Sequence, residues 1–505
     1  MRLRSLPDCY RGAFAEVDGI DEWIHTLIQP HPQVGCSDKS YCRTIWQRLV
    51  LGLEESMTDT GISARTMVAR ERQKSVMLRV WILSGLFFMA LPGTLLGFSN
   101  LMAISAHHGM QQLPAAWMEG HGHAQMFGWI GSFILGIGYY SQPWRDRKWL
   151  QMQSICFGLW TAGVALRWLA NIYAWEWRVL FPVSAGFELI AVVLFLKAAS
   201  QHKMPTADRA TAKKVGMEPW MMSVMIGTVG LTGGVAFNFV ECVRLALGGT
   251  MESFPHALDQ KYLVLIGWGF LVPMVWGFSA RWLPAFLAIS AADGKKLRLA
   301  LGLDLAGAFF GLAGFSKVGT LLLAASTVTI FFALHLGQRP HGRAKVQGIH
   351  PSFPYFVRLA FLWLMVAGWM SLWAAIGDHH GGIWGASRHA LTVGFAATMV
   401  FAMGPRILPH FTGVADIFSK RLMLVSLLLL TVGCFLRVSS EPLAYEGFLG
   451  FAWRVLPLSG VLELSAVLLF AWNLSATLLF GRSVFAAATS EEAATGNGAR
   501  LTGHA

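Results

Sequence analysis

The sequence predicts an all-α membrane protein with about twelve transmembrane helices in three pseudo-repeated four-helix units. Apolar residues come in blocks of about twenty with few charges inside, the length that a helix needs to cross a bilayer. The chain is 54% hydrophobic and 13% charged, far less charged than a soluble domain. Lysines and arginines gather between alternate blocks, and several short sequence motifs recur along the chain.

The apolar blocks predict a transmembrane domain over residues 76–482. Segment 1–75 is polar, so it is either an amphipathic extension at the membrane surface or a stretch ahead of a true start at Met67 or Met77. Segment 483–505 is predicted to be a disordered cytoplasmic tail. The predicted spans are 78–99, 121–140, 149–172, 178–197, 220–243, 261–283, 297–315, 318–337, 354–376, 388–408, 421–437 and 453–480.

The basic residues predict which side of the membrane each connection faces. They cluster in every second connection, so the positive-inside rule places both termini in the cytoplasm. The net charge of +12 is accounted for by these connections and does not indicate nucleic-acid binding. The expected partner of the surface is the lipid bilayer. The six cysteines show neither a CxxC spacing nor a disulfide framework.

Histidines stand at the start of two predicted spans. His121 and His123 lie in the segment GHGHAQMFGWIG, and His389 lies in the segment SRHALTVGFA. The predicted topology puts all three at the outer end of their spans, and bilayer insertion by itself does not require imidazole there. These positions therefore indicate a functional site.

Repeated motifs suggest that the chain contains equivalent units. His107-His108-Gly109 recurs as His379-His380-Gly381, and the sequence WRVL at 177–180 recurs at 453–456. An acid follows in each case, Glu188 and Glu463. Arg281-Trp282-Leu283-Pro284 at the end of the sixth span resembles Arg406-Ile407-Leu408-Pro409 at the end of the tenth. Spans two, six and ten are therefore predicted to occupy equivalent positions, with histidine at the outer end of the second and tenth.

With these motifs the chain resembles the haem-copper oxidase subunit I superfamily over roughly residues 78–480. In detail, GHGHAQMFGWIG together with RHALTVGFAATMVFAMGPRILPHFTG is similar to the NnrS family of bacterial membrane proteins, which is associated with haem, copper and the response to nitric oxide. The resemblance implies a bacterial inner-membrane location, a b-type haem, copper, and nitric oxide or another diatomic gas as ligand.

The chain departs from the oxidases at the second metal centre. That centre uses histidines on the sixth and seventh helices, and neither predicted span contains one here. His256 comes too early in the sixth span to match. An oxidase or proton pump is therefore not predicted, and whether the chain is an enzyme, a sensor or a protective protein stays open, as does its electron donor.

The predicted haem ligands are His123 and His389, since imidazole is the usual axial ligand of a six-coordinate haem. His121 lies roughly 200° from His123 around a helix, so it is a candidate for another metal site or a propionate contact. Arginines at span ends or within spans are candidates for propionate pairing: Arg178, Arg454, Arg167 and Arg437. Arg167 and Arg437 could also pair with the acids Glu188 and Glu463, for which a proton or polar-network role is considered.

The outer loops contain two further histidine pairs, which are candidates for copper because clustered imidazoles bind it. They are His107, His108, His379 and His380. A competing hypothesis is a cofactor-free secondary transporter of twelve helices that uses Glu188 and Glu463 for coupling.

Overall fold

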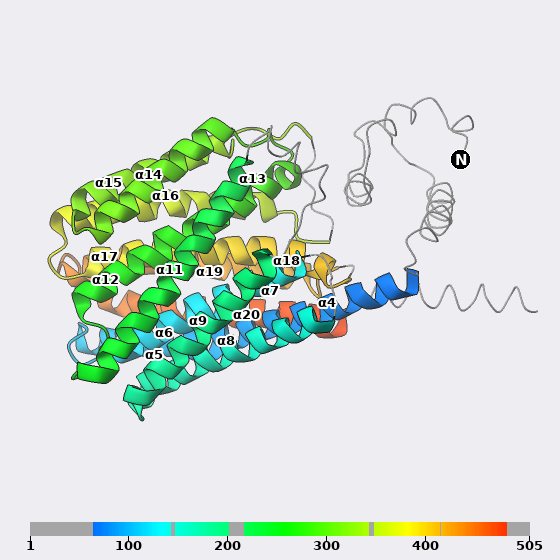
Figure 1. Ribbon diagram of the computed structural model, residues 1–505. Helices are drawn as coiled ribbons and strands as arrows, with labels where there is room; N and C mark the ends of the chain where they lie inside the picture. Colours follow the sequence, from blue (N-terminus) through cyan, green and yellow to red (C-terminus); the bar gives the residue numbers. More distant parts are fainter. Residues whose placement is uncertain (1–63, 143–146, 201–216, 343–347, 415, 482–505) are drawn as a thin grey trace, which may run out of the picture. The chain divides into compact units, whose positions relative to one another are not determined.

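A computed structural model describes residues 64–142, 147–200, 217–342, 348–414 and 416–481. The described residues of the transmembrane region fold into α-helices and short π-helical segments, marked η, and include no strand (Figure 1). The chain divides into two units at Ala69–Arg70, and everything below concerns the second unit, from Arg70 onward.

The first half of the helices covers the predicted spans one to six. The elements are α4 (Ala64–Phe88), η2 (Met89–Leu95), α5 (Leu96–His107), α6 (Ala115–His123), η3 (Ala124–Gly131), α7 (Ser132–Tyr140), α8 (Arg147–Tyr173), α9 (Trp177–Ser200), α11 (Pro219–Gly248), α12 (His256–Val264), η4 (Leu265–Leu271) and α13 (Val272–Leu287).

The second half follows the same style of long helices joined by short loops. The elements are α14 (Gly294–Leu312), α15 (Ser316–Ala333), α16 (Phe353–Gly377), α17 (Gly382–His389), η5 (Ala390–Ala397), α18 (Thr398–Phe411), α19 (Lys420–Tyr445) and α20 (Ala452–Phe480).

Ten of the described helical stretches are long and apolar enough to cross a membrane, which confirms an all-α membrane protein. The predicted span 121–140 is helical too, within Ala115–Tyr140, and so is 297–315 up to Leu312, within Gly294–Leu312, but neither belongs to the ten. The first contains two histidines, Glu119 and Gln125, and the second begins with three basic residues and contains Asp304. Such polar residues lower the hydropathy of a helix below that of an ordinary span.

Three pairs of neighbouring helices pack closely along their lengths. They are α8 with α9, α14 with α15, and α19 with α20. Glycines bring the two backbones together in each pair: a Cβ built on Gly163, Gly307 or Gly433 would lie within 3.1 Å of a carbonyl oxygen of the facing helix. Small residues of this kind allow close helix packing in membranes.

Each long helix that contains a predicted histidine ligand changes to π-helix directly after it. The segment η3 begins at the residue after His123, and η5 begins at the residue after His389. A third segment, η4, interrupts the predicted sixth span. A π-helical segment widens the backbone spiral and is frequent at functional sites. The two histidine positions are thus alike in local backbone as well as in sequence.

Candidate functional site

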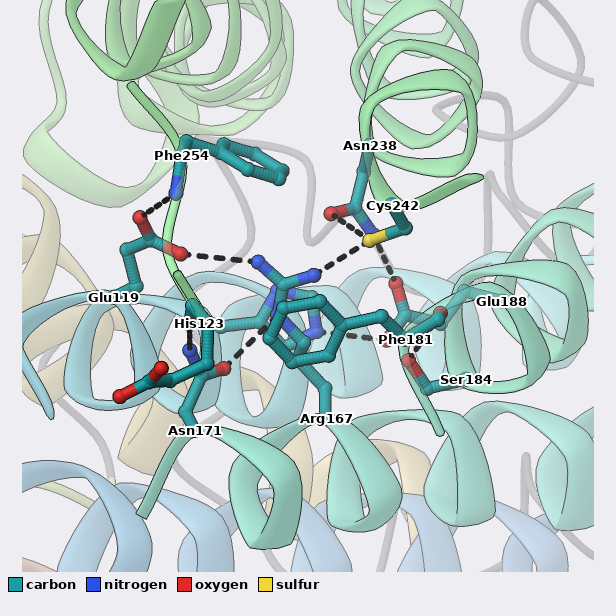
Figure 2. Close-up of polar contacts among 11 residues, drawn as sticks. Glu119, His123, Arg167, Asn171, Phe181, Ser184, Glu188, Asn238, Cys242 and Phe254 are labelled. Atoms are coloured by element: carbon teal, nitrogen blue, oxygen red, sulfur yellow. Dashed lines mark hydrogen bonds and ion pairs between the residues drawn. The ribbon is translucent and has the colours of Figure 1, made fainter. Parts of the chain in front are cut away.

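His123 forms a buried pair with an acid of another helix. Its Nε2 lies 2.7 Å from Oε1 of Glu188 on α9, with 7% and 0% of the two residues exposed. The amide of Asn238 on α11 donates to the other carboxylate oxygen at 3.3 Å (Figure 2). The imidazole also stacks on Phe127, one turn further along. His123 is therefore bound at the nitrogen that would otherwise be available to a metal.

Arg167 lies at the centre of the same polar cluster and uses all three of its nitrogens. Nη2 donates to Glu119 Oε2 at 3.1 Å, Nε donates to Asn171 at 2.9 Å, and Nη1 reaches Cys242 Sγ at 2.5 Å (Figure 2). Its guanidinium carbon lies 4.1 Å from the centre of the Phe181 ring. This satisfied arrangement matters because an unpaired buried charge is very costly.

Glu119 connects the cluster to the loop before α12. Its second oxygen accepts the backbone N–H of Phe254 at 2.5 Å, and the neighbouring Asn171 donates to the carbonyl of Glu252 at 3.2 Å. The cluster thus joins α6, α8 and the 252–254 loop through hydrogen bonds, and α9 and α11 through His123, Glu188 and Cys242. We call Glu119, His123, Arg167, Asn171, Glu188, Asn238 and Cys242 the N-terminal cluster.

A related arrangement surrounds His389, and it is less complete. Arg437 on α19 pairs with Glu441 one turn later at 3.2 Å, and Glu441 Oε2 lies 3.6 Å from His389 Nδ1. The His389 Nδ1 lies 2.9 Å from the carbonyl of Gly385. Within the described part of the chain, Nη1 of Arg437 is buried and makes no hydrogen bond. We call His389, Arg437 and Glu441 the C-terminal cluster.

The two clusters supply the carboxylate from different helices. Arg167 and Asn171 are four residues apart on α8, as Arg437 and Glu441 are on α19. The first arginine takes its carboxylate from Glu119, four residues before His123, whereas the residue four before His389 is Gly385. A Cβ on Gly385 would collide with the Glu441 carboxylate. In the N-terminal cluster this position carries the Glu119 side chain. In the C-terminal cluster the glycine leaves the space free, and the carboxylate of Glu441 from α19 occupies it.

His121 lies beside the C-terminal cluster, although it is only two residues from His123 of the N-terminal cluster. Its Nδ1 lies 2.9 Å from the carbonyl of Gly93, and its ring fills the space next to Gly97, where a Cβ would collide with it. His121 interacts electrostatically with Arg437 and with His389. No hydrogen bond of the described residues involves Nε2 of His121 or of His389.

These contacts allow a test of which histidines fit a haem iron. A metal-bound imidazole typically donates its other N–H to a backbone carbonyl or a carboxylate. The carbonyls of Gly93 and Gly385 can hold Nδ1 of His121 and His389 in this way and leave Nε2 available. His123 instead directs Nε2 to Glu188. His121 and His389 therefore have the hydrogen-bonding arrangement of metal-bound imidazoles, and Nη1 of Arg437 beside them is buried without a hydrogen bond.

Of the remaining predicted residues, Arg178 and Arg454 are exposed at helix starts, and Glu463 interacts electrostatically with Arg437 and Glu441 of the C-terminal cluster. Arg178 donates to the carbonyls of Ala246 and Gly249, at 3.2 Å and 2.8 Å. Glu463 keeps one buried oxygen without a hydrogen bond. Arg167 and Arg437 form ion pairs with Glu119 and Glu441, whereas Glu188 and Glu463, which the sequence offered as alternative partners, interact with them electrostatically but form no ion pair with them among the described residues.

The four loop histidines are all exposed. His108 has a left-handed backbone conformation and stacks on Trp453, with ring centres 5.2 Å apart. Among the described residues, no group of three or more His, Cys, Asp or Glu side chains is placed to hold a metal ion.

Sequence reasoning missed several members of the clusters. Glu119, Asn171, Asn238, Cys242 and Glu441 were not singled out. Two of them carry a local signal, since Asn171 and Glu441 lie four residues after a buried arginine, on the same helix face. Glu119 also lies four residues before His123 on α6. Asn238 and Cys242 meet the cluster from α11 and give no such signal.

Comparison with known families adds one match. A family model described as "Domain of unknown function (DUF8744)" matches residues 344–478. No curated protein matches the chain.

Proposed function

We propose that this protein is a haem-binding, multi-pass membrane protein of the NnrS type, in which His121 and His389 would hold the haem. The proposal rests on the hydrogen bonding of the two imidazole rings. In each ring Nδ1 lies 2.9 Å from a backbone carbonyl oxygen, and Nε2 makes no hydrogen bond with the described residues. The sequence prediction paired His389 with His123. The proposal replaces His123 because its Nε2 already binds Glu188 at 2.7 Å.

The residues around this position have definable tasks. The carbonyls of Gly93 and Gly385 fix the tautomer and the orientation of the two rings. Arg437 has a buried nitrogen without a hydrogen bond, which suits a haem propionate because a guanidinium binds carboxylates strongly. Gly97 leaves room for the His121 ring.

A bound haem would supply electron transfer and, when one ligand leaves, reversible binding of a diatomic gas. Nitric oxide is the gas that the family resemblance favours. Copper is a separate expectation from the same resemblance, and elemental analysis of the purified protein tests it.

We further infer that the helices form twelve spans in three four-helix units. Three features support this. The first is that π-helical segments begin at Ala124, Leu265 and Ala390, in the second span of each predicted unit; a further one, η2, lies in the first span. Each unit also ends in one of the three closely packed helix pairs. The matched family region, 344–478, brackets the four helical spans of the third unit.

A secondary transporter without cofactor is the second candidate. The observation that favours it is the buried pair of His123 and Glu188, two ionisable groups within the helix bundle. Groups of this kind often mark proton or ion pathways in membrane proteins.

The first experiment is an optical one on protein purified in detergent after expression with added haem precursor. The account predicts a b-type reduced-minus-oxidised spectrum, a pyridine haemochrome signal, and a spectral change when nitric oxide is added. A folded protein without any haem signal would reject the proposal and favour the transporter.

A further inference from the structure

Asp304 lies near the middle of α14, within the membrane-spanning part of the fold. Its side chain is fully enclosed, with 0% exposed. The residues on its face of the helix, such as Leu301 and Ala308, are buried as well, whereas Leu305 and Phe309 on the other side are exposed. The carboxyl group therefore points into the helix bundle and away from lipid.

Neither oxygen of Asp304 has a partner in the part of the chain that the structure describes. Both are buried and make no hydrogen bond, and no cation is paired with them. The other buried acids differ in this respect: Glu119 and Glu441 pair with arginines, and Glu188 pairs with His123. Asp304 is thus isolated among apolar groups.

The charged groups of the neighbouring helices lie toward the helix ends. None of the described ones interacts electrostatically with Asp304. The other ionisable groups of α14 and of the helices packed against it are Lys295, Lys296 and Arg298 on α14, Lys317 on α15, Glu241, Cys242 and Arg244 on α11, and His256, Asp259, Lys261 and Tyr262 on α12. An ionised carboxylate without any such partner is too costly to bury, so Asp304 carries a proton.

Asp304 adds no contact that would stabilise the fold. A neutral carboxyl group still has a donor and acceptors, and leaving them unpaired in an apolar interior is unfavourable. An apolar side chain of similar size would avoid that penalty. The residue therefore calls for an explanation other than packing.

The helices next to α14 indicate which segment lies near Asp304. A Cβ on Gly311 would lie 3.4 Å from Val264 of α12, and Asp304 lies seven residues earlier, two turns along the same face of α14. Because consecutive spans run antiparallel, this face of α14 lies toward the chain that follows Val264, which is the π-helical segment η4. Helix α14 packs against η4.

We propose that Asp304 is a proton-binding site within the membrane, which takes up and releases a proton through rearrangement of α14 against η4. The proton leaves the carboxyl group to water and returns from it, so no oxidant or further reactant is needed. The site is separate from the two histidine clusters, and the proposal does not depend on haem.

Infrared spectroscopy of the full-length protein in lipid provides the test. A protonated carboxyl group has a C=O band apart from the amide bands, and this band shifts when its proton is replaced by deuterium. Wild type is compared in H₂O and D₂O with Asp304→Asn. The variant Glu463→Gln, with Glu446→Gln and Glu441→Gln beside it, identifies the bands of the other described acids that have a buried oxygen without a hydrogen bond.

The proposal predicts a band that is absent from Asp304→Asn, present in Glu463→Gln and shifted in D₂O. A missing band in wild type, or one that fails to shift after long incubation in D₂O, would overturn the proposal, since the acid would then be ionised or permanently sealed.

A second variant separates a proton site from a structural role. Asp304→Leu should unfold at the same temperature as wild type or higher, because no contact is lost. The apolar reagent dicyclohexylcarbodiimide should form an N-acylurea at Asp304 of wild type. The carboxyl oxygen adds to the carbodiimide carbon while the carboxyl proton moves to one nitrogen, and the acyl group then shifts from oxygen to the other nitrogen, so that its bond to oxygen breaks as the carbon–nitrogen bond forms and no group leaves. A lower unfolding temperature for Asp304→Leu, or no adduct at Asp304, would contradict the proposal.

Discussion

Single residues determine from which helix each buried arginine receives its carboxylate. In the N-terminal cluster Glu119 supplies it, and Asn171 accepts from the same guanidinium. In the C-terminal cluster Glu441 supplies it, because Gly385 leaves the space that a side chain would fill. Both clusters thus contain an arginine–carboxylate pair, although the acid comes from a different helix in each. This indicates that each cluster needs a carboxylate to balance the charge of its arginine.

This difference between the clusters can be tested by moving the acid of the N-terminal cluster from position 119 to position 171, the position that corresponds to Glu441. Glu119→Gly should lower the free energy of unfolding by about 3–5 kcal/mol, because it leaves the Arg167 charge buried and unpaired. Adding Asn171→Glu should restore much of that loss, since the new acid lies four residues from Arg167. Denaturant unfolding in detergent measures both.

The single variant Asn171→Glu is the control and should itself be destabilised, because two carboxylates then meet one arginine. Equal stability of the double variant and Glu119→Gly would show that the two clusters are not built alike.

At the scale of the helices, close approach of backbones sets the packing. A Cβ on Gly230 of α11 would collide with the carbonyl of Gly269 in η4, whereas one on Gly233 would meet nothing within 4 Å. The two glycines lie three residues apart on one helix and differ in their surroundings. Comparing their alanine variants therefore distinguishes the effect of helix packing from the effect of helix propensity.

Gly230→Ala should destabilise the protein by about 1–3 kcal/mol or prevent folding, because backbone atoms cannot yield as a side chain can. Gly233→Ala should be neutral or stabilising by roughly 0.5–1 kcal/mol, the usual helix preference for alanine. Thermal unfolding of both variants checks the difference. Similar losses for the two would argue against close contact of α11 with η4.

The start of α14 gives a prediction for pH. Asp293 accepts the backbone N–H groups of Lys296 and Lys295, which hold its pKa below the ordinary aspartate value. A lowered pKa in the folded state means that the charge stabilises the protein above the ordinary aspartate pKa, and that this contribution disappears as the pH falls through the lowered pKa.

Wild type and Asp293→Asn should therefore differ more in unfolding temperature at neutral pH than in acid. Asparagine keeps the capping oxygen, so the comparison isolates the charge. A difference that does not change with pH would contradict this role of Asp293.

The sequence predicts the helices better than it predicts their contacts. Apolar block length alone located all the long helices, because bilayer thickness dictates it. The π-helical segments were not expected, since they depend on how neighbouring helices fit. Polar residues within spans were recognised as unusual, and Arg167, Arg437 and Glu188 are indeed buried among polar partners.

At the scale of the whole molecule, the partners of those residues come from distant parts of the chain. The bond from Phe254 to Glu119 spans 135 residues, and that between Glu188 and His123 spans 65. A single sequence does not reveal such pairs, so His123 was predicted to face His389. The fold pairs His123 with Glu188 in the N-terminal cluster and leaves Nε2 of His389 without a hydrogen bond among the described residues of the C-terminal cluster.

The proposed haem site therefore depends on His389 of the C-terminal cluster and on His121 beside it. Variants of the three histidines test this site most directly. His121→Ala, His123→Ala and His389→Ala are purified after expression with added haem precursor, and their haem content and reduced spectra are measured against wild type. We predict that His121→Ala and His389→Ala lose haem or the six-coordinate b-type spectrum, while His123→Ala keeps both. Loss in His123→Ala with retention in His121→Ala would contradict the proposed ligand pair.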